Sequence, residues 1–271
     1  MSESYLVFSM KKIVYVLIII LVFGLISCNK KTTVVNNVIN QTVDIEDEIK
    51  LETLEDVICN TIDKVEQSVV GIKAVNDKSL LKNESFGSGV IISKKNNKYY
   101  IVTNRHVVVS HDKVYDNIDI YLGNLDLYLD ANVVVYDKRI DLAVIEVETE
   151  ILLKVCELGS VDTLKKGKFC IAIGSPYEID TYYNTVIVGN ISSVKRLINE
   201  SNYYYKELTN EYIQSTATLN VGCSGGGLFD LRGKLIGINT WKLVDSSSNI
   251  DGMNFSISVD IVKEIFSDYL L

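Results

Sequence analysis

A serine stands among glycines late in the chain, in the run Gly-Cys-Ser-Gly-Gly-Gly at 222–227. Small neighbours let the backbone turn sharply, which exposes the hydroxyl of Ser224 and lets nearby amide N–H groups converge on one point. Such amides could hold the oxyanion of an acyl-transfer intermediate. Glycine-rich turns also serve geometry alone, so this run needs partners before it indicates a nucleophile.

A serine nucleophile needs a general base, and the chain has only two histidines. His106 follows the hydrophobic run at 100–103, where a strand could hold it rigidly. His111 stands in the polar stretch Ser-His-Asp-Lys at 110–113, which favours a position on the surface. The sequence therefore predicts His106 as the base, and it excludes any site that needs several histidine ligands.

The third member of such a site is a carboxylate that fixes the tautomer of the imidazole and stabilises its charged form. Asp141 opens the run Asp-Leu-Ala-Val-Ile-Glu-Val at 141–147, at the start of an alternating hydrophobic strand. Without the histidine and the serine, it would be interpreted as a turn or a strand cap. With them it is the predicted carboxylate, and Asp112 and Asp137 are the next acids to test.

Short hydrophobic or alternating runs must position these three side chains, and they recur without long helices between them. This spacing predicts an all-β sandwich or barrel rather than a parallel α/β sheet. Asn96-Asn97 is the expected turn of a hairpin. The predicted strands are Val69–Val75, Val90–Ser93, Tyr100–Thr103, Ile118–Leu122, Ala131–Tyr136, Leu142–Val147, Phe169–Ile173, Thr185–Val188, Tyr212–Ala217, Lys234–Trp241 and Met253–Val259.

Two short helices are expected at the ends of this β-rich body. Hydrophobic positions in Leu51–Glu66 recur near helical spacing. The segment 259–270 repeats the pattern, and Asp260 is a candidate cap for it.

The composition describes a globular chain without a nucleic-acid partner. Hydrophobic residues make up 47% and charged residues 23% of the 271 residues, as in proteins with a substantial core. Lys and Arg total 27 against 35 Asp and Glu, which gives a net charge of -8. Because there is no basic excess and no arginine-rich run, we expect no binding of nucleic acid.

The motifs and their order resemble trypsin-like serine endopeptidases of the HtrA/Deg type, which have the chymotrypsin fold. The resemblance covers most of residues 60–268, and seven segments occur in the family order. Besides the histidine, aspartate and serine segments, they are Gly-Ser-Gly-Val-Ile-Ile at 87–92, Gly-Lys-Phe-Cys-Ile-Ala-Ile-Gly-Ser-Pro at 167–176, Thr-Val-Ile-Val-Gly-Asn-Ile-Ser-Ser-Val at 185–194 and Gly-Met-Asn-Phe-Ser-Ile at 252–257.

This resemblance implies two packed antiparallel β-barrels with the active site in the cleft between them. His106 and Asp141 would come from the first barrel and Ser224 from the second, and the amides of Gly222 and Ser224 would form the oxyanion hole. The substrates would be polypeptides, and neither a metal nor an organic cofactor is expected. A homotrimer is typical of the family and compatible with the sequence, which does not itself indicate one.

Two positions beside the serine depart from the family pattern. The family usually has Asn or Asp where Cys223 stands, and commonly Pro where Val221 stands. A cysteine cannot accept a new N-terminus, so activation by zymogen cleavage is not expected. A Cys223 nucleophile is the less favoured alternative, because it would put Val221 at the position where the family pattern has the first glycine of the turn. Since the chain ends soon after the protease body, we expect no PDZ domain.

The primary specificity pocket is predicted from the residues before the serine and from the strand at 239–241. None of these residues is charged, which favours a small or medium hydrophobic P1 side chain. Trp241 is expected either to narrow the pocket or to pack in the barrel core. The predicted lining is Thr218, Leu219, Thr240 and Trp241, with Ala217 and Asn239 beside them.

The N-terminus has the features of a targeting signal. The hydrophobic run at 13–27 follows Lys11-Lys12 and is shorter than the ~20 residues that span a bilayer. The segment Leu-Ile-Ser-Cys at 25–28 resembles a bacterial lipobox, which implies cleavage before Cys28 and its lipidation; an uncleaved signal anchor is the alternative. The expected organisation is a lipoprotein signal peptide at 1–27, a polar tether at 28–50 and a protease domain at 51–271, with the first barrel at about 66–150, the second at about 155–258 and the C-terminal helix at 259–270.

Four further cysteines stand at positions 59, 156, 170 and 223. In an exported protein this even count permits disulfides, but the three possible pairings cannot be separated and no stapled scaffold is matched. A domain of this size does not require them.

Two functions follow from these patterns. The first is a serine endopeptidase anchored in the bacterial cell envelope, in the periplasm or on the cell surface, that degrades misfolded or exported proteins. The second is a surface lipoprotein of protease type that has lost activity and serves as a binding module. The presence of His106, Asp141 and Ser224 together favours the first.

Overall fold

The computed structural model describes residues 53–76, 83–177, 179–197, 211–242 and 252–270. The predicted signal peptide, the tether and Cys28 lie outside the described residues. The chain divides into two units, Met1–Val57 and Ile58–Leu271, and of the first only the helical residues 53–57 are described. Within the described ranges, no helix combines the length and the hydrophobicity needed to cross a membrane.

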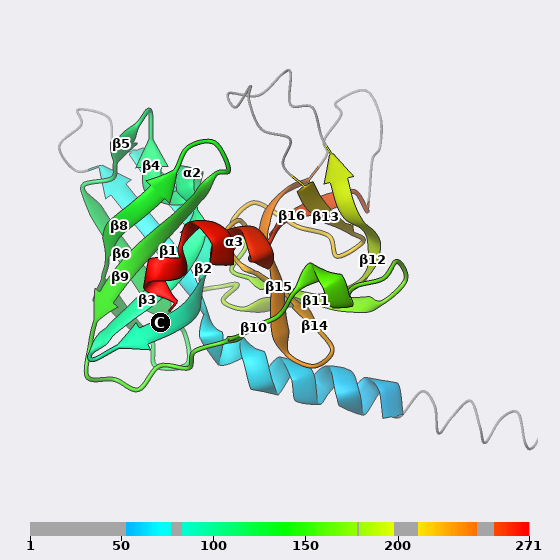
Figure 1. Ribbon diagram of the computed structural model, residues 1–271. Coiled ribbons are helices and arrows are strands. Elements are labelled where there is room, and N and C mark those ends of the chain that lie inside the picture. Colours follow the sequence, from blue (N-terminus) through cyan, green and yellow to red (C-terminus); the bar gives the residue numbers. More distant parts are fainter. Residues whose placement is uncertain (1–52, 77–82, 178, 198–210, 243–251, 271) are drawn as a thin grey trace, which may run out of the picture. The chain divides into compact units, whose positions relative to one another are not determined.

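Seven antiparallel strands form the first sheet, in the order β7-β6-β1-β2-β3-β9-β8 (Figure 1). The β2–β3 hairpin turns at Asn96, whose φ of 58° lies in the left-handed region that asparagine tolerates, as the sequence predicts. The strands are β1 (Val69–Asn76), β2 (Asn83–Lys95), β3 (Lys98–Asn104), β6 (Asn117–Leu122), β7 (Leu127–Asp130), β8 (Asn132–Asp137) and β9 (Leu142–Glu148).

The second sheet has the order β10-β15-β14-β11-β12-β13-β16, and a further pairing of β15 with β16 closes six of its strands into a barrel. The short β10 joins β15 in parallel. In the first sheet, by contrast, β7 and β8 are not paired with each other among the described residues. The strands are β10 (Glu157–Leu158), β11 (Phe169–Gly174), β12 (Thr185–Leu197), β13 (Glu211–Ser215), β14 (Gly227–Asp230), β15 (Lys234–Lys242) and β16 (Asn254–Ser258).

The predicted all-β fold of two packed barrels is confirmed, with one barrel closed and the other open at one seam. Every predicted strand overlaps an observed one. Five short strands were not predicted: β7, β10, β14 and the two strands of a small ribbon, β4 (Val109–Ser110) and β5 (Lys113–Val114). Short strands bury few residues, so they leave a weak alternating pattern in the sequence.

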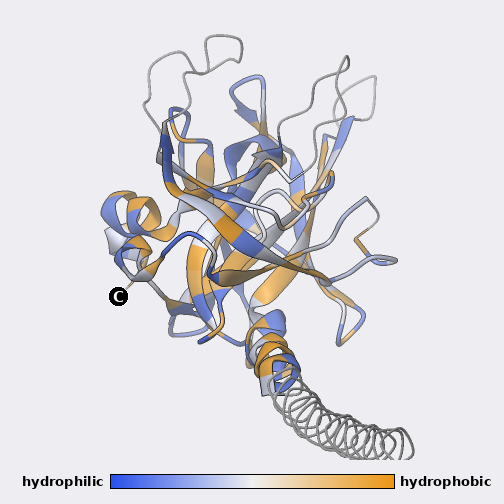
Figure 2. Cartoon of the chain, turned by 90° about the vertical axis from the view of Figure 1, so that its right-hand side faces the viewer, coloured by the Kyte–Doolittle hydropathy of each residue, from blue (hydrophilic) through white to orange (hydrophobic). Residues whose placement is uncertain are grey.

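Alternation along the strands divides the hydrophobic residues among three cores. In β2, Ile91 points into the first barrel, whereas Val90 and Ile92 point into a core shared by both barrels. The shared core also receives Ile171 and Ile173 from β11, and the second barrel has an interior of its own. Figure 2 shows hydrophobic stretches along the strands of both sheets. Packing through the shared core fixes one barrel against the other.

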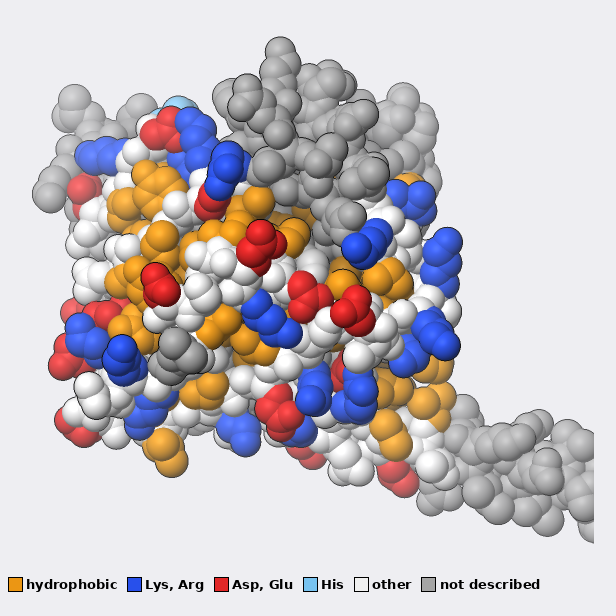
Figure 3. All heavy atoms as spheres, viewed as in Figure 1, with side chains coloured by type: hydrophobic (Ala, Val, Ile, Leu, Met, Phe, Trp, Pro, Cys, Tyr) orange, Lys and Arg blue, Asp and Glu red, His pale blue; other side chains and the backbone are white. Residues whose placement is uncertain are grey.

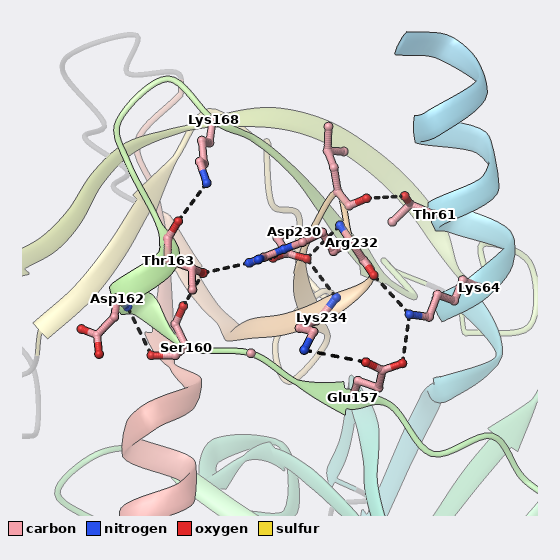
Figure 4. A network of polar contacts seen from close by, with 12 residues as sticks. Thr61, Lys64, Glu157, Ser160, Asp162, Thr163, Lys168, Asp230, Arg232 and Lys234 are labelled. Carbon is pink, nitrogen blue, oxygen red and sulfur yellow. Dashed lines mark hydrogen bonds and ion pairs between the residues drawn. The ribbon is translucent and has the colours of Figure 1, made fainter. Parts of the chain in front are cut away.

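The helical residues 58–65 are fastened to the turn between β14 and β15 by polar contacts (Figure 4). Lys64 pairs with Glu157 at 3.0 Å and donates to the carbonyl of Arg232 at 3.2 Å. Thr61 donates to the carbonyl of Leu231 at 3.0 Å. After this helix, η1 (Glu66–Ser68) leads directly into β1.

The C-terminal helix α3 (Val259–Ile265) packs into the shared core through Val259 and Val262. Its cap is Ser258, whose side chain accepts the N–H of Asp260, so the expected cap role of Asp260 is wrong. The Asp260 carboxylate instead accepts the N–H of Val161 in η2 (Val161–Thr163) at 2.8 Å. Beyond α3, η3 (Ser267–Tyr269) returns the chain to the first sheet.

Basic and acidic side chains are interspersed on the face seen in Figure 3. This mixture agrees with the absence of a basic excess in the sequence.

Candidate active site

His106 and Asp141 form a closely coupled pair at one end of the first barrel. His106 lies on the single-turn helix α2 (Arg105–Val108) that follows β3, and Asp141 directly precedes β9. The His106 Nδ1 atom lies 2.6 Å from Asp141 Oδ2, and the His106 backbone N–H donates to Asp141 Oδ1 at 3.0 Å. With its Nδ1 proton directed at the carboxylate, the imidazole keeps Nε2 as a free acceptor.

The backbone of Asp141 is held by the same turn that carries the histidine. Its φ of 57° is left-handed, and its carbonyl accepts the Arg105 N–H and the Asn104 side-chain amide, both at 3.0 Å. The pairing of Asn104 with Leu142 in the β3–β9 ladder brings these two strand ends together. Strand register therefore sets the distance between His106 and Asp141.

The pKa of His106 is raised above its ordinary value of 6.5. Desolvation of the ring lowers this pKa, but the negative charge of Asp141 and its hydrogen bond raise it by more, while the charge of Arg105 opposes them. The histidine side chain remains 46% exposed and that of Asp141 only 13%, so the ring is open to a reactant while its partner is shielded.

Ser224 lies in the turn between β13 and β14, and its Oγ donates to the carbonyl of Thr240 at 3.0 Å. Both flanking glycines have left-handed φ angles, 95° at Gly222 and 86° at Gly225. A Cβ at Gly222 would lie 2.6 Å from the carbonyl oxygen of Ser175. This turn therefore requires glycine at both places.

The backbone of the turn leaves two amide groups without a partner. The carbonyl of Val221 accepts the Tyr177 N–H at 2.8 Å, and that of Cys223 accepts the Gly226 N–H at 3.0 Å. In a trans peptide the N–H points opposite to the carbonyl, so the N–H groups of Gly222 and Ser224 point away from these contacts. Among the described residues neither has an acceptor, as an oxyanion hole requires.

Contacts across the shared core bring the serine turn to the histidine turn. A Cβ at Gly87 of β2 would lie 2.6 Å from the side chain of Val107 and 3.1 Å from the Ser224 carbonyl oxygen, so both turns pack against this glycine. The Asn104 side chain, which holds Asp141, also donates to Thr240 Oγ1 at 3.1 Å. The Ser224 hydroxyl is thus held by the Thr240 carbonyl, and it must leave this acceptor before it can donate to the histidine.

The predicted pocket residues take different positions. Thr218 is exposed, whereas Leu219 is buried and its N–H donates to Asn254 Oδ1 at 2.8 Å. Thr240 is buried beside the serine. Trp241 is half-buried and stacks on Phe255 with ring centroids 4.3 Å apart, which agrees with the packing alternative for this residue. Their role in substrate specificity stays a prediction.

The other acids and the second histidine are engaged elsewhere. Asp137 pairs with Arg139 at 2.7 Å, and Asp112 pairs with Lys138 at 2.6 Å as well as with the buried Arg105. The ring of His111 contacts the hydroxyl of its neighbour Ser110. These contacts disfavour both alternative carboxylates.

The four described cysteines are free thiols. Cys223 is 1% exposed, and burial raises the pKa of its thiol. A thiol that is buried and protonated is a poor nucleophile, which disfavours the cysteine alternative.

Sequence reasoning did not single out Asn104 or Ser88 as site residues. Ser88 is fully buried in β2 and contacts the serine turn. For Ser88 the only available signal was its position as a polar residue between Gly87 and Gly89, in a segment otherwise interpreted as a strand.

Comparisons with known proteins agree with this architecture. The trypsin-like peptidase domain family matches residues 87–238. The serine protease Do-like HtrA of Lactobacillus helveticus is 36% identical over 190 residues, which are 69% of this chain and 44% of that protein. The protein of the same name from Bacillus subtilis is 33% identical over 226 residues, or 79% and 48%.

A probable periplasmic serine endoprotease, DegP-like, from Buchnera aphidicola subsp. Baizongia pistaciae is 38% identical over 190 residues, covering 70% of this chain and 37% of that protein. The solved structure of the HtrA-type protease AlgW with tripeptide matches with a TM-score of 0.63 and 29% identity, over 78% of this chain and 63% of that one. This chain spans less than half the length of these curated relatives. It belongs to the trypsin-like peptidase domain family, and the relatives that it resembles are HtrA-type serine proteases.

Proposed function

We propose that the chain is a serine endopeptidase that cleaves polypeptides through an acyl-enzyme, with Ser224 as nucleophile, His106 as general base and acid, and Asp141 as the orienting carboxylate. The observation that carries the proposal is the double contact of Asp141 with the backbone and the ring of His106. It leaves the Nε2 atom of a half-exposed imidazole ready to accept a proton.

In the proposed reaction, the Ser224 hydroxyl turns from the Thr240 carbonyl toward His106. Its oxygen attacks the scissile carbonyl carbon while its proton moves to His106 Nε2. The oxyanion that forms accepts the N–H groups of Gly222 and Ser224. When the intermediate collapses, the C–N bond breaks and the imidazolium gives its proton to the leaving amine. Water then hydrolyses the ester by the same steps, which restores the serine.

Covalent labelling tests this proposal directly. A fluorophosphonate probe reacts with an activated serine, so the full chain should be labelled and Ser224→Ala should not. Ser110→Ala, which changes a half-buried serine near the histidine turn, is the matched control and should label like the wild type. A wild-type chain that binds unfolded polypeptides but neither hydrolyses them nor reacts with the probe would support the inactive binding module instead.

We further propose that the chain is anchored in the cell envelope by a lipid on Cys28. The lipobox-like segment supports this, and so does the periplasmic assignment in the name of one relative. Misfolded or exported proteins would then be the available substrates. Expression in a bacterial host with labelled palmitate should label the wild type and leave Cys28→Ser unlabelled, and absence of label from the wild type would contradict the anchor.

The homotrimer suggested by the family resemblance stays a prediction. Light scattering on the purified chain measures it, because a trimer has three times the mass of one chain.

A further inference from the structure

Ser88 links the serine turn of the second barrel to a strand of the first. It lies in β2, is fully buried, and has polar groups on both its backbone and its side chain in use. Its backbone N–H donates to the carbonyl of Ser224 at 2.8 Å. Its hydroxyl donates to the carbonyl of Gly222 at 2.7 Å and accepts the Ser175 N–H at 2.8 Å. All three bonds cross from the first barrel to the second.

The position of the Gly222 carbonyl matters for the two free amides. Gly222 lies between two peptide groups. The Val221–Gly222 peptide carries the Gly222 N–H, and the Gly222–Cys223 peptide carries the carbonyl that Ser88 holds. Because glycine at φ 95° has no Cβ to restrict it, those two planes can rotate unless hydrogen bonds fix them. The Val221 carbonyl is fixed by the Tyr177 backbone. The next peptide is held at its carbonyl by the Ser88 side chain and at its N–H, which belongs to Cys223, by the Asn220 carbonyl at 3.0 Å.

The same strand also reaches the histidine turn. The carbonyl of Ser88 accepts the Thr103 hydroxyl at 2.7 Å, and Thr103 lies in β3, which leads into the turn of His106. Ser88 therefore connects β3, the strand that leads to His106, with the carbonyls of the residues on both sides of Cys223.

We infer that Ser88 is a positioning residue for catalysis: its hydroxyl holds the Gly222 peptide so that the N–H groups of Gly222 and Ser224 face the oxyanion. It touches no reacting atom and acts through the serine turn. This inference rests on the proposed function, since it gives Ser88 a role in that reaction. Removal of the hydroxyl leaves the Gly222 carbonyl buried without its donor, so only the bond of the Cys223 N–H to Asn220 still restrains that peptide.

The test compares Ser88→Ala with Ser68→Ala in the full chain. Ser68 is also fully buried, and its hydroxyl also donates to a backbone carbonyl, that of Val65 at 2.6 Å, away from the serine turn. Both variants lose a buried hydroxyl, so both should melt at a lower temperature. Only Ser88→Ala should lose kcat, by about 10²-fold with KM unchanged, as expected when an oxyanion donor is displaced.

A second readout separates positioning from general loss of structure. A peptide boronic acid forms a tetrahedral adduct with the serine, whereas the matching product peptide does not. Ser88→Ala should weaken the binding of the boronic acid by the same factor by which it lowers kcat/KM, and it should leave the affinity for the product peptide unchanged. Ser88→Cys keeps the side-chain shape and replaces the hydroxyl by a weak S–H donor. It takes the place of Ser88→Ala if that variant does not fold. Its kcat should lie between those of the wild type and Ser88→Ala.

The outcomes distinguish this inference from the proposed function. Wild-type hydrolysis and labelling together with an unimpaired kcat in folded Ser88→Ala would overturn the role of Ser88 alone. Equal losses of kcat in Ser88→Ala and Ser68→Ala would assign both effects to stability and would also overturn it. A wild-type chain that shows neither hydrolysis nor labelling would refute the proposed function, and the catalytic role of Ser88 with it.

Discussion

Replacing Asp141 by asparagine changes one atom type at the carboxylate and should disable the base. The His106 backbone N–H needs an acceptor at the Oδ1 position, 3.0 Å away, so the amide oxygen of the asparagine will occupy that position. The amide nitrogen then faces His106 Nδ1, which lies 2.6 Å from Oδ2 in the wild type. Two N–H groups cannot face each other, so Nδ1 becomes the acceptor and the ring proton moves to Nε2.

This exchange of tautomers sets the magnitude. With its proton on Nε2, the imidazole cannot accept the proton of Ser224. Under the proposed mechanism the loss in kcat should therefore approach ~10⁴-fold, as it does in Ser-His-Asp triads with this change. That factor corresponds to about 5.4 kcal/mol of transition-state stabilisation. The fold should survive, because asparagine has the same shape and can still accept the His106 backbone N–H.

The dependence of the rate on pH provides an independent check. In the wild type the raised pKa of His106 puts the acid limb of kcat/KM above pH 6.5. Asp141→Asn removes the charge and the hydrogen bond that raise this pKa, and leaves desolvation and Arg105, which lower it. The acid limb of any residual activity should therefore move to lower pH.

The stability of the folded chain should also depend on pH through His106. A raised pKa in the folded state means that protonated His106 stabilises the wild type fully below its unfolded value, and this contribution is lost as pH rises through the folded pKa. The difference in melting temperature between the wild type and Asp141→Asn should thus grow as pH falls from about 8 to about 5. Near wild-type kcat in Asp141→Asn, or an acid limb that does not move, would refute the reasoning.

Three further outcomes are expected. Gly225→Ala should cost several kcal/mol and lower the urea midpoint sharply, because its Cβ would lie 2.1 Å from the Ser88 carbonyl oxygen at a left-handed φ; an unchanged midpoint would contradict this geometry of the serine turn. Cys223→Ala should keep most peptide hydrolysis while Ser224→Ala loses it, and the reverse pattern would make this a cysteine protease. Lys64→Ala should change the free energy of unfolding by less than about 1 kcal/mol, because its ion pair is exposed, and a larger loss in denaturant titrations would show that the helix contacts matter more than their exposure suggests.

The sequence alone was enough to predict the class of fold and the family of the protein. Short hydrophobic runs such as Leu142–Val147 predict buried strands, and because successive residues of a strand point to opposite faces, Leu142 and Val144 face the shared core while Ala143, Ile145 and Val147 face the first barrel. Asn96 predicted its hairpin because its residue type tolerates the left-handed conformation of a tight turn. The scarcity of histidine left one strong candidate base, and the glycine run marked the serine.

Contacts between residues far apart in the chain could not be predicted in this way. Ser258 caps α3 because it directly precedes the helix, whereas the carboxylate of Asp260 accepts the N–H of Val161 in η2, nearly a hundred residues away. Trp241 packs on Phe255 because β15 and β16 pair to close the second barrel. No local pattern encodes either partner.

The types and spacing of neighbouring residues thus determined which side chains are candidates for the proposed reaction, and the tertiary structure decided how those side chains are held. Asp141 rather than Asp112 meets His106 because the β3–β9 register brings its backbone to the histidine turn. In the sequence Ser88 is only a small residue in a strand, and it acquires its partners Gly222, Ser224 and Ser175 only when the second barrel packs against the first. Hydrogen bonds depend on the direction and separation of two groups in space, and for distant segments those are set only by packing of the whole chain.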